Sequence, residues 1–467
     1  MKTTSDSLPS GIGPSIDRAV YNTADPVVKL ASPPKGQGVI IGRSSKKKKD
    51  LNGLVYIGQV IENTPARNLL GSGVWLDIDY PHVIYISGTR GSGKSFDLGV
   101  ILEGIGALTV PSVIQSGVDS QCSILLDMQN QFWTLSYEPR AGIKENDEQI
   151  ADLKRWNLSP NSLSNCKVYI PSGTEAVTGK EVCFQLTAGD VLPEEWCTLI
   201  GQPLYSPQGH IISQCVEALE GKSYDVADMI RHIESSASLA STAESTRNAV
   251  IYKLRDVERT ALFSRRGLDM RELLTPGRCS VLMIRDIRNE DKSIVAAMIA
   301  RKMFREMGKH HSRKKANAFF GNGGGDGGLP SKAWLFIDEA HIVVPKDAPS
   351  PARDALVEYV KRGRDAGLSL VIATQQPSAI DDRILSQVNL SINHRLTFQS
   401  DISAASNRIP TKVLSSMKVA GSTVSDFGDM LRLLDSGECF VGDNSTSRTV
   451  IVSIRPRITS HGGYNPS

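Results

Sequence analysis

The feature that most constrains the fold of this chain is the octapeptide GTRGSGKS at residues 88–95. It matches the phosphate-binding pattern G-x-x-x-x-G-K-S/T, in which glycines let the backbone approach an anion closely. The apolar, β-branched run at 83–86 predicts a buried strand before it, and residues 96–102 can continue as a helix after it. A strand, a glycine loop and a helix N-terminus direct backbone N–H groups and a helix dipole at one anion. The sequence therefore predicts a P-loop site that binds ATP or GTP.

Every residue of this loop, and the one after it, is a predicted nucleotide contact. Lys94 is expected to reach the β- and γ-phosphates, and the hydroxyl of Ser95 to bind Mg²⁺. The complete predicted set is Gly88, Thr89, Arg90, Gly91, Ser92, Gly93, Lys94, Ser95 and Phe96.

A later apolar strand supplies the acids that such a site needs. Residues 333–337 are followed directly by Asp338 and Glu339. In P-loop ATPases an acid at this place holds the magnesium shell, and a neighbouring residue orients or polarises the attacking water. We therefore predict that Asp338 serves the metal together with Ser95, and that Glu339 activates the water.

The next apolar strand, 368–373, ends in polar residues and follows a basic turn. A polar side chain at the tip of this strand can sense the γ-phosphate, a role for which Gln375 is preferred over Thr374. An arginine from the basic turn can neutralise transition-state charge across a subunit interface. Arg364 is the preferred candidate and Arg362 the second. An ordinary strand-end turn and an exposed arginine at a helix end remain the alternatives.

Strands and helices alternate from residue 83 onward, which predicts an α/β fold with a mainly parallel sheet. The pattern predicts five segments: a flexible arm (1–35), a small β-barrel-like module (36–80), a core (81–139 and 276–440), a mostly helical insertion (140–275) and a C-terminal extension (441–467).

Within the core, a helix is expected over 292–307. The basic run 309–315 and the glycines of 321–328 then predict a surface loop. The lysines at 46–49 predict a hairpin tip, with a phosphate-contacting loop as the alternative.

The composition limits the cellular compartment that we expect for this chain, but it does not identify a binding partner. The net charge of +3 neither requires nor excludes nucleic acid, because a local patch matters more than the sum. The seven cysteines form no Cys-x-x-Cys pair, which argues against zinc and suits a reducing cytoplasm. No stretch approaches 18 apolar residues and no signal peptide is apparent, so we expect a cytoplasmic chain without a membrane span.

Taken in order, the motifs resemble the HerA–FtsK family of ring ATPases, and its HerA branch most closely. The resemblance rests on GTRGSGKS (88–95), FIDEAH (336–341), GRDAGL (363–368) and ATQQPS (373–378), with a family-like ending at 437–442 and 460–463. Two places depart from the family pattern. Gln376 replaces an arginine, and 128–132 replaces a Gly-Glu-Tyr-like stretch.

The resemblance implies a RecA-like core in a homohexameric ring, with hydrolysis of ATP with Mg²⁺ at subunit interfaces. It also implies a C-terminal extension that braces a neighbouring subunit, and translocation of double-stranded DNA with a separate nuclease or effector in end processing or antiphage defence. The loop with Lys346 and Arg353 is either a DNA-channel element or a solvated loop. The alternative function is a ring-shaped scaffold that regulates a partner enzyme with little translocation.

Overall fold

The fold rests on one large mixed sheet. A computed structural model describes residues 16–17, 27–30, 36–43, 52–61, 71–321, 328–407, 417–419, 422–424, 426–444 and 448–462. The arm predicted at 1–35 lies outside them except for two short strands, β1 (Ile16–Asp17) and β2 (Val27–Leu30).

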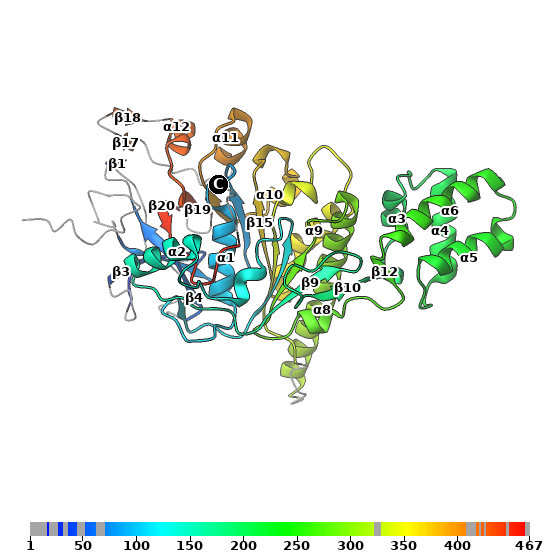
Figure 1. Cartoon of the computed structure of the whole chain (residues 1–467), viewed down its shortest axis with the longest axis horizontal. Helices are drawn as coiled ribbons and strands as arrows, with labels where there is room; N and C mark the ends of the chain where they lie inside the picture. The colour runs from blue at the N-terminus through cyan, green and yellow to red at the C-terminus, as the bar shows by residue number, and fades with distance from the viewer. Residues whose placement is uncertain are drawn as a thin grey trace, which may run out of the picture.

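The parallel half of the sheet carries the motifs (Figure 1). Its strands run in the order β10 (Val182–Phe184), β9 (Cys166–Pro171), β13 (Cys279–Met283), β8 (Cys122–Asp127), β14 (Ala333–Ile337), β15 (Leu368–Thr374), β6 (Val83–Ser87) and β16 (Leu390–Asn393). Each of these strands pairs in parallel with its neighbours in that list. The carboxyl ends of the strands with the P-loop and the acidic pair therefore meet at one edge, which confirms the predicted α/β, RecA-like core.

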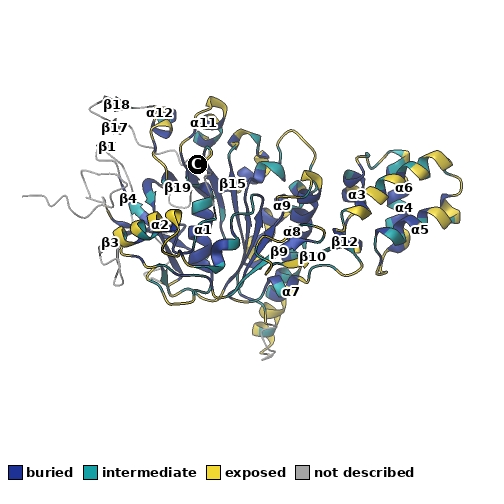
Figure 2. Ribbon diagram, in the orientation of Figure 1, coloured by how far each residue is buried: buried dark blue, intermediate teal, exposed yellow. Residues whose placement is uncertain are grey.

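Helices cover both faces of this sheet. Ile84 and Ile86 pack in one cluster with Leu98 of α1 (Lys94–Ile105), whereas Tyr85 belongs to a cluster on the other face with α8 (Asn289–Phe320) and α9 (Pro351–Arg362). This alternation is the period of two expected of a strand. Figure 2 shows the strands buried between the helical layers.

The antiparallel half corrects the prediction of a separate barrel at 36–80. β19 (Glu438–Asp443) and β20 (Arg448–Ile454) connect β16 to β4 (Leu54–Val60), β5 (Gly73–Asp77), β3 (Gly36–Ile41) and β2, and β7 (Gln115–Ser116) also pairs with β4. Val452 opposite Val60 joins the N-terminal strands to the core sheet. Among the described strands no pairing closes them into a barrel. A C-terminal strand supplies the junction, so local sequence could not reveal it.

The stretch 140–275 is also divided differently from the prediction. Its strand β9 lies inside the core sheet, and α2 (Lys144–Arg155) lies near β3 and β4, far from the other helices of this stretch (Figure 1). A helical unit at the opposite end, which contacts α8 through α3, contains α3 (Pro193–Leu199), α4 (Pro207–Leu219), α5 (Val226–Ser235) and α6 (Glu244–Arg259). Short elements connect it to the core: β11 (Leu186–Thr187), β12 (Phe263–Ser264) and α7 (Met270–Leu273).

Helix α8 runs through the basic stretch 309–315, where a surface loop was predicted. Residues 309–320 contain no glycine or proline, so nothing in them ends a helix. Gly321, with φ of +69°, ends it in the left-handed conformation that favours glycine. The prediction of a loop was therefore wrong for 309–320, and 322–327 lie outside the described residues.

The C-terminal segment packs into its own chain. Smaller elements precede it: α10 (Asp382–Leu385), α11 (Gln399–Ser406), β17 (Met417–Val419), β18 (Ser422–Val424) and α12 (Phe427–Arg432). The predicted extension from 441 begins inside β19, and the residues after β20 are buried against α1, where Arg455 pairs with Glu103. Bracing of a neighbouring subunit stays a prediction. Across the described part of the chain, no helix combines the length and apolarity that crossing a bilayer requires.

Candidate active site

The P-loop leaves β6 and enters α1 as the sequence predicts. Gly91 and Gly93 have φ values of +75° and +126°, a region that L side chains rarely adopt. Lys94 Nζ donates to the carbonyl of Thr89 at 2.8 Å, so the lysine closes the loop on itself. Burial lowers the pKa of Lys94, against the charges of Glu339 and other nearby carboxylates.

A histidine that belongs to none of the sequence motifs packs against the P-loop. His394, fully buried after β16, lies 2.7 Å from Asp97 of α1 (Nε2 to Oδ2) and 2.8 Å from the carbonyl of Glu438 (Nδ1 to O). A Cβ atom on Gly88 would come within 2.8 Å of its Cβ, and one on Gly93 within 3.0 Å of its Cε1. The loop glycines are therefore needed for packing on His394 as well as for their dihedral angles.

Some of the predicted nucleotide contacts line a cavity, and the others stabilise the P-loop without lining it. Arg90, Gly91, Gly93, Lys94, Ser95 and Phe96 line a cavity of about 560 Å³ that also includes Glu339 and Gln375. Gly88, Thr89 and Ser92 do not line it. Ser92 and Thr89 instead brace the turn, because Ser92 Oγ donates to the Thr89 carbonyl at 2.8 Å.

Asp338 is fully buried at the end of β14, and neither carboxylate oxygen has a hydrogen-bond partner among the described residues. Burial, and then the charges of Glu339 and Asp127, raise the pKa of Asp338 well above its usual value, while Lys94 opposes the shift. Such a carboxylate fits a site for a cation or its water shell. With the hydroxyl of Ser95 on the cavity wall, these residues suit Mg²⁺ bound with a nucleotide.

Glu339 is held in place by two glutamines. It adopts φ of +48°, and its Oε1 accepts hydrogen bonds from Gln375 Nε2 and, at 2.6 Å, from Gln129 Nε2. Gln131 Nε2 donates to Gln129 Oε1 at 3.0 Å and extends the chain of amides. The other oxygen, Oε2, lies 3.5 Å from Nδ1 of His341. The structure thus brings Gln375, which follows β15, to Glu339, and the sensor role of Gln375 stays a prediction.

Gln129 is a site residue that sequence reasoning missed. It lies in the stretch 128–132, which departs from the family pattern. Asp127 shapes this stretch: its carboxylate accepts from the backbone N–H of Gln129 at 3.0 Å and of Phe132 at 2.9 Å. Burial raises the pKa of Asp127 to about 6, against these hydrogen bonds. The available signal was the apolar strand ending in an acid, which placed 128–132 at the same sheet edge as Glu339.

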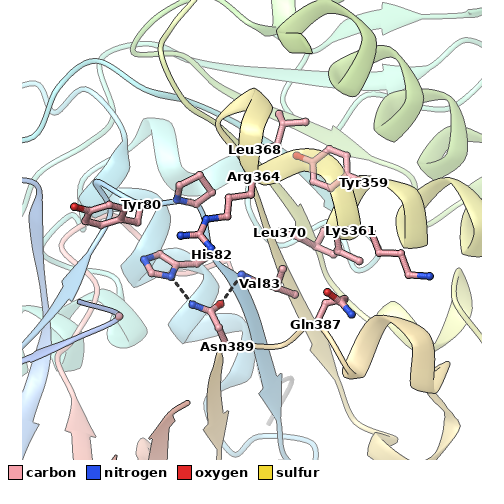
Figure 3. A pocket seen from close by; sticks show the side chains of 13 residues that line it. Tyr80, His82, Val83, Tyr359, Lys361, Arg364, Leu368, Leu370, Gln387 and Asn389 are labelled. Atoms are coloured by element: carbon pink, nitrogen blue, oxygen red, sulfur yellow. Dashed lines mark hydrogen bonds between the residues drawn. The ribbon is translucent and has the colours of Figure 1, made fainter. Parts of the chain in front are cut away.

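Arg364 lies near the amino ends of the parallel strands, at the end of the sheet opposite the P-loop. It lines a cavity of about 540 Å³ with Val83, at the start of β6, and Leu370 (Figure 3). The P-loop follows the far end of β6, about 13 Å away at about 3.3 Å per residue. No described residue forms an ion pair or hydrogen bond with its guanidinium, whereas Arg362 pairs with Glu358. Arg364 therefore does not line the P-loop cavity of its own chain, and its role as an arginine finger stays a prediction.

The candidate DNA contacts are not free cations. Lys346 Nζ lies 3.1 Å from Asp382 Oδ2, and Arg353 Nε lies 3.6 Å from Asp381 Oδ2. The lysines at 46–49 lie outside the described residues. A channel role for any of them stays a prediction.

The chain is similar in sequence to proteins of one known family. Residues 56–303 match the model described as "Helicase HerA, central domain", and residues 323–441 match "Helicase HerA-like C-terminal". The chain is 26% identical over 129 residues to the DNA double-strand break repair helicase HerA of Sulfolobus acidocaldarius, covering 28% of this chain and 24% of that protein. HerA of Sulfurisphaera tokodaii is 27% identical over 127 residues, which is 27% of this chain and 23% of that one. The matches thus span about a quarter of these relatives.

Solved structures agree on the fold. VirB4 of Thermoanaerobacter pseudethanolicus superposes with a TM-score of 0.51 at 12% identity, covering 87% of this chain and 97% of that chain. The bacterial conjugative coupling protein TrwB, in an unbound form, gives a TM-score of 0.50 at 12% identity, covering 90% and 91%. At this identity the likeness concerns the fold alone.

Proposed function

This chain belongs to the HerA family of P-loop NTPases, and we propose from that premise that it hydrolyses ATP with Mg²⁺ to move double-stranded DNA. The observation that carries the proposal is the position of Glu339. Two glutamines fix its carboxylate in the same cavity as Lys94 and Ser95. A carboxylate held beside a phosphate-binding loop is suited to orient and deprotonate an attacking water.

The placement of the residues supports the roles that we propose for them. Lys94 leaves the Thr89 carbonyl to bind the β- and γ-phosphates, and the N-terminus of α1 adds its dipole. Ser95 and Asp338 would hold a bound Mg²⁺, which would supply positive charge to the phosphates. Gln375 and Gln129 hold Glu339 toward the water. Gln375 reports the presence of the γ-phosphate through the same hydrogen bond.

Assembly as a homohexameric ring completes the proposal. Arg364 carries a guanidinium without a described partner at the sheet edge opposite its own nucleotide site. In a ring, one subunit presents that edge to the nucleotide of the next, and Arg364 then acts as the arginine finger. The DNA and a separate nuclease or effector, in end processing or antiphage defence, are the partners we propose.

A second candidate is an ATPase scaffold for an effector enzyme. The observation that favours it is the helical unit α3–α6, which lies at the far end of the molecule from the P-loop (Figure 1). Two large aromatic side chains are exposed there, Tyr205 at 97% and Tyr252 at 67%, as at a protein-binding surface.

ATP hydrolysis with and without linear duplex DNA separates the candidates. A translocase is stimulated by DNA, and the stimulation fades between about 50 and about 200 mM salt because phosphate contacts release counterions. An ATP hydrolysis rate that does not change when DNA is added supports the scaffold. Lys94→Ala is the control that must abolish either activity. A protein that hydrolyses no ATP, even with DNA and at concentrations that saturate assembly, would refute both.

A further inference from the structure

The cavity at the P-loop continues past the residues that phosphate chemistry uses. The rest of its lining, which we call the far end, consists of Asp152 and Arg155 in the last turn of α2, Trp156 directly after it, and Pro456 and His461 of the C-terminal segment. These segments are distant in sequence from the P-loop and from each other. The whole cavity, about 560 Å³, has the size of a small-molecule site, and a triphosphate alone would occupy only its P-loop end.

The wall of this far end is aromatic. Phe96, directly after the P-loop, lies with its ring centroid 5.1 Å from that of His461, at an interplanar angle of 31°. Trp156 is half-buried and packs on Tyr56, with centroids 6.4 Å apart. Flat rings of this kind bind planar heteroaromatic groups by stacking, which tolerates different bases because each has a π-face.

The polarity of the far end also fits a base. Burial, and then the charge of Arg457, lower the pKa of His461 to about 3, so the ring on the wall is neutral at physiological pH. Arg155 and Asp152 form an ion pair whose groups are about half exposed at the rim. Together they offer donors and an acceptor to the ring nitrogens and exocyclic group of a purine.

We propose that the far end of this cavity is the nucleobase subsite, where the base of the bound nucleotide stacks on Trp156 and on the Phe96–His461 pair. The inference rests on the proposed nucleotide-binding function and extends it to segments that no motif marks. It also assigns a role to α2 and the C-terminal segment: they recognise the nucleotide from within the same chain, next to the P-loop.

Calorimetric titration with ATP and with inorganic tripolyphosphate, both with Mg²⁺, tests the proposal. Tripolyphosphate reaches the P-loop but has no base. Trp156→Ala should weaken ATP binding about five-fold to about a hundred-fold, the usual worth of one aromatic stack, and leave tripolyphosphate binding unchanged. Trp156→Phe should restore most of the loss. His461→Ala should weaken ATP selectively as well.

The controls separate this proposal from the one on which it rests. Trp133→Ala removes a half-buried tryptophan that packs on Tyr137 outside the cavity, and should change neither titration. Lys94→Ala should weaken both ligands, and if it weakens neither, the phosphate site itself is wrong. If the wild-type protein binds ATP no more tightly than tripolyphosphate, or if Trp156→Ala and His461→Ala weaken both ligands equally or neither, the base subsite is refuted while the P-loop site stands.

Discussion

Replacing Glu103 by glutamine should destabilise this protein more than any exposed charge change. Glu103 is fully buried on α1, and Arg455 Nη1 lies 2.7 Å from its Oε2. Its Oε1 accepts from the backbone N–H of Thr459 at 2.9 Å and from the Thr459 hydroxyl at 2.7 Å. Arg457 Nε is 3.6 Å from the same oxygen. One carboxylate therefore anchors residues 455–459 of the C-terminal segment on α1.

The magnitude follows from the burial of both partners. Glutamine keeps the shape but removes the charge, and leaves two fully buried guanidinium groups facing a neutral amide. Removing one partner of a buried ion pair costs about 3–5 kcal/mol, because the remaining charge stays out of water. A typical domain has a free energy of unfolding of about 5–15 kcal/mol, so this loss is a large fraction.

Urea unfolding followed by circular dichroism measures the loss. Glu358→Gln is the matched control, because Glu358 makes an exposed ion pair with Arg362 on α9 and should lose about 0.5 kcal/mol or less. Glu103→Gln should also weaken ATP binding, since His461 closely follows the anchored residues. A loss below about 1 kcal/mol for Glu103→Gln, no larger than that of the control, would show that the buried pair does not hold the segment.

Other predictions test the site and the packing around it. Glu339→Gln should lower ATP hydrolysis about 100-fold or more in a steady-state assay and keep ATP binding in titrations. Gln129→Ala should lower kcat about ten-fold to about 100-fold with KM nearly unchanged, because a misplaced general base loses about that much; an unchanged kcat contradicts the role. Gly104→Ala should cost at least about 1–3 kcal/mol in urea unfolding, because the new Cβ would lie 2.0 Å from Val55 Cγ1. The pKa of His461 is about 3 in the folded state and about 6.5 in the unfolded state. Between these two pH values the ring binds a proton only when the protein unfolds. The free energy of unfolding should therefore fall by about 1 kcal/mol from this group as pH drops from about 6.5 to about 5.5, and His461→Gln should lack that component when unfolding is measured at both values.

Local sequence was enough to place the nucleotide site on the fold. The P-loop and the pair Asp338–Glu339 each lie at the end of an apolar run, and parallel strands carry such ends to one edge of a sheet. The alternation of strands and helices was enough for the α/β class. These inferences succeed because they depend on residues within a few positions of one another.

What failed depends on pairing between distant segments. The strands of 36–80 belong to the core sheet because β20, far along the chain, pairs with β4. The assignment of 140–275 to a single insertion failed because β9 pairs with β13. Helix α8 was too short in the prediction because a basic run was taken for a loop, although it contains no residue that ends a helix.

The sequence by itself determined that this chain is a P-loop NTPase with an acidic pair at the same sheet edge, because those motifs are contiguous and their spacing fixes their geometry. Only the tertiary structure decided what surrounds them. His394 supports the loop through Asp97, 297 positions away, and Gln129 reaches Glu339 across 210 positions. Arg364 lies about the length of one strand away from the nucleotide site of its own chain. These contacts come from the packing of distant segments around one core, which no local pattern encodes.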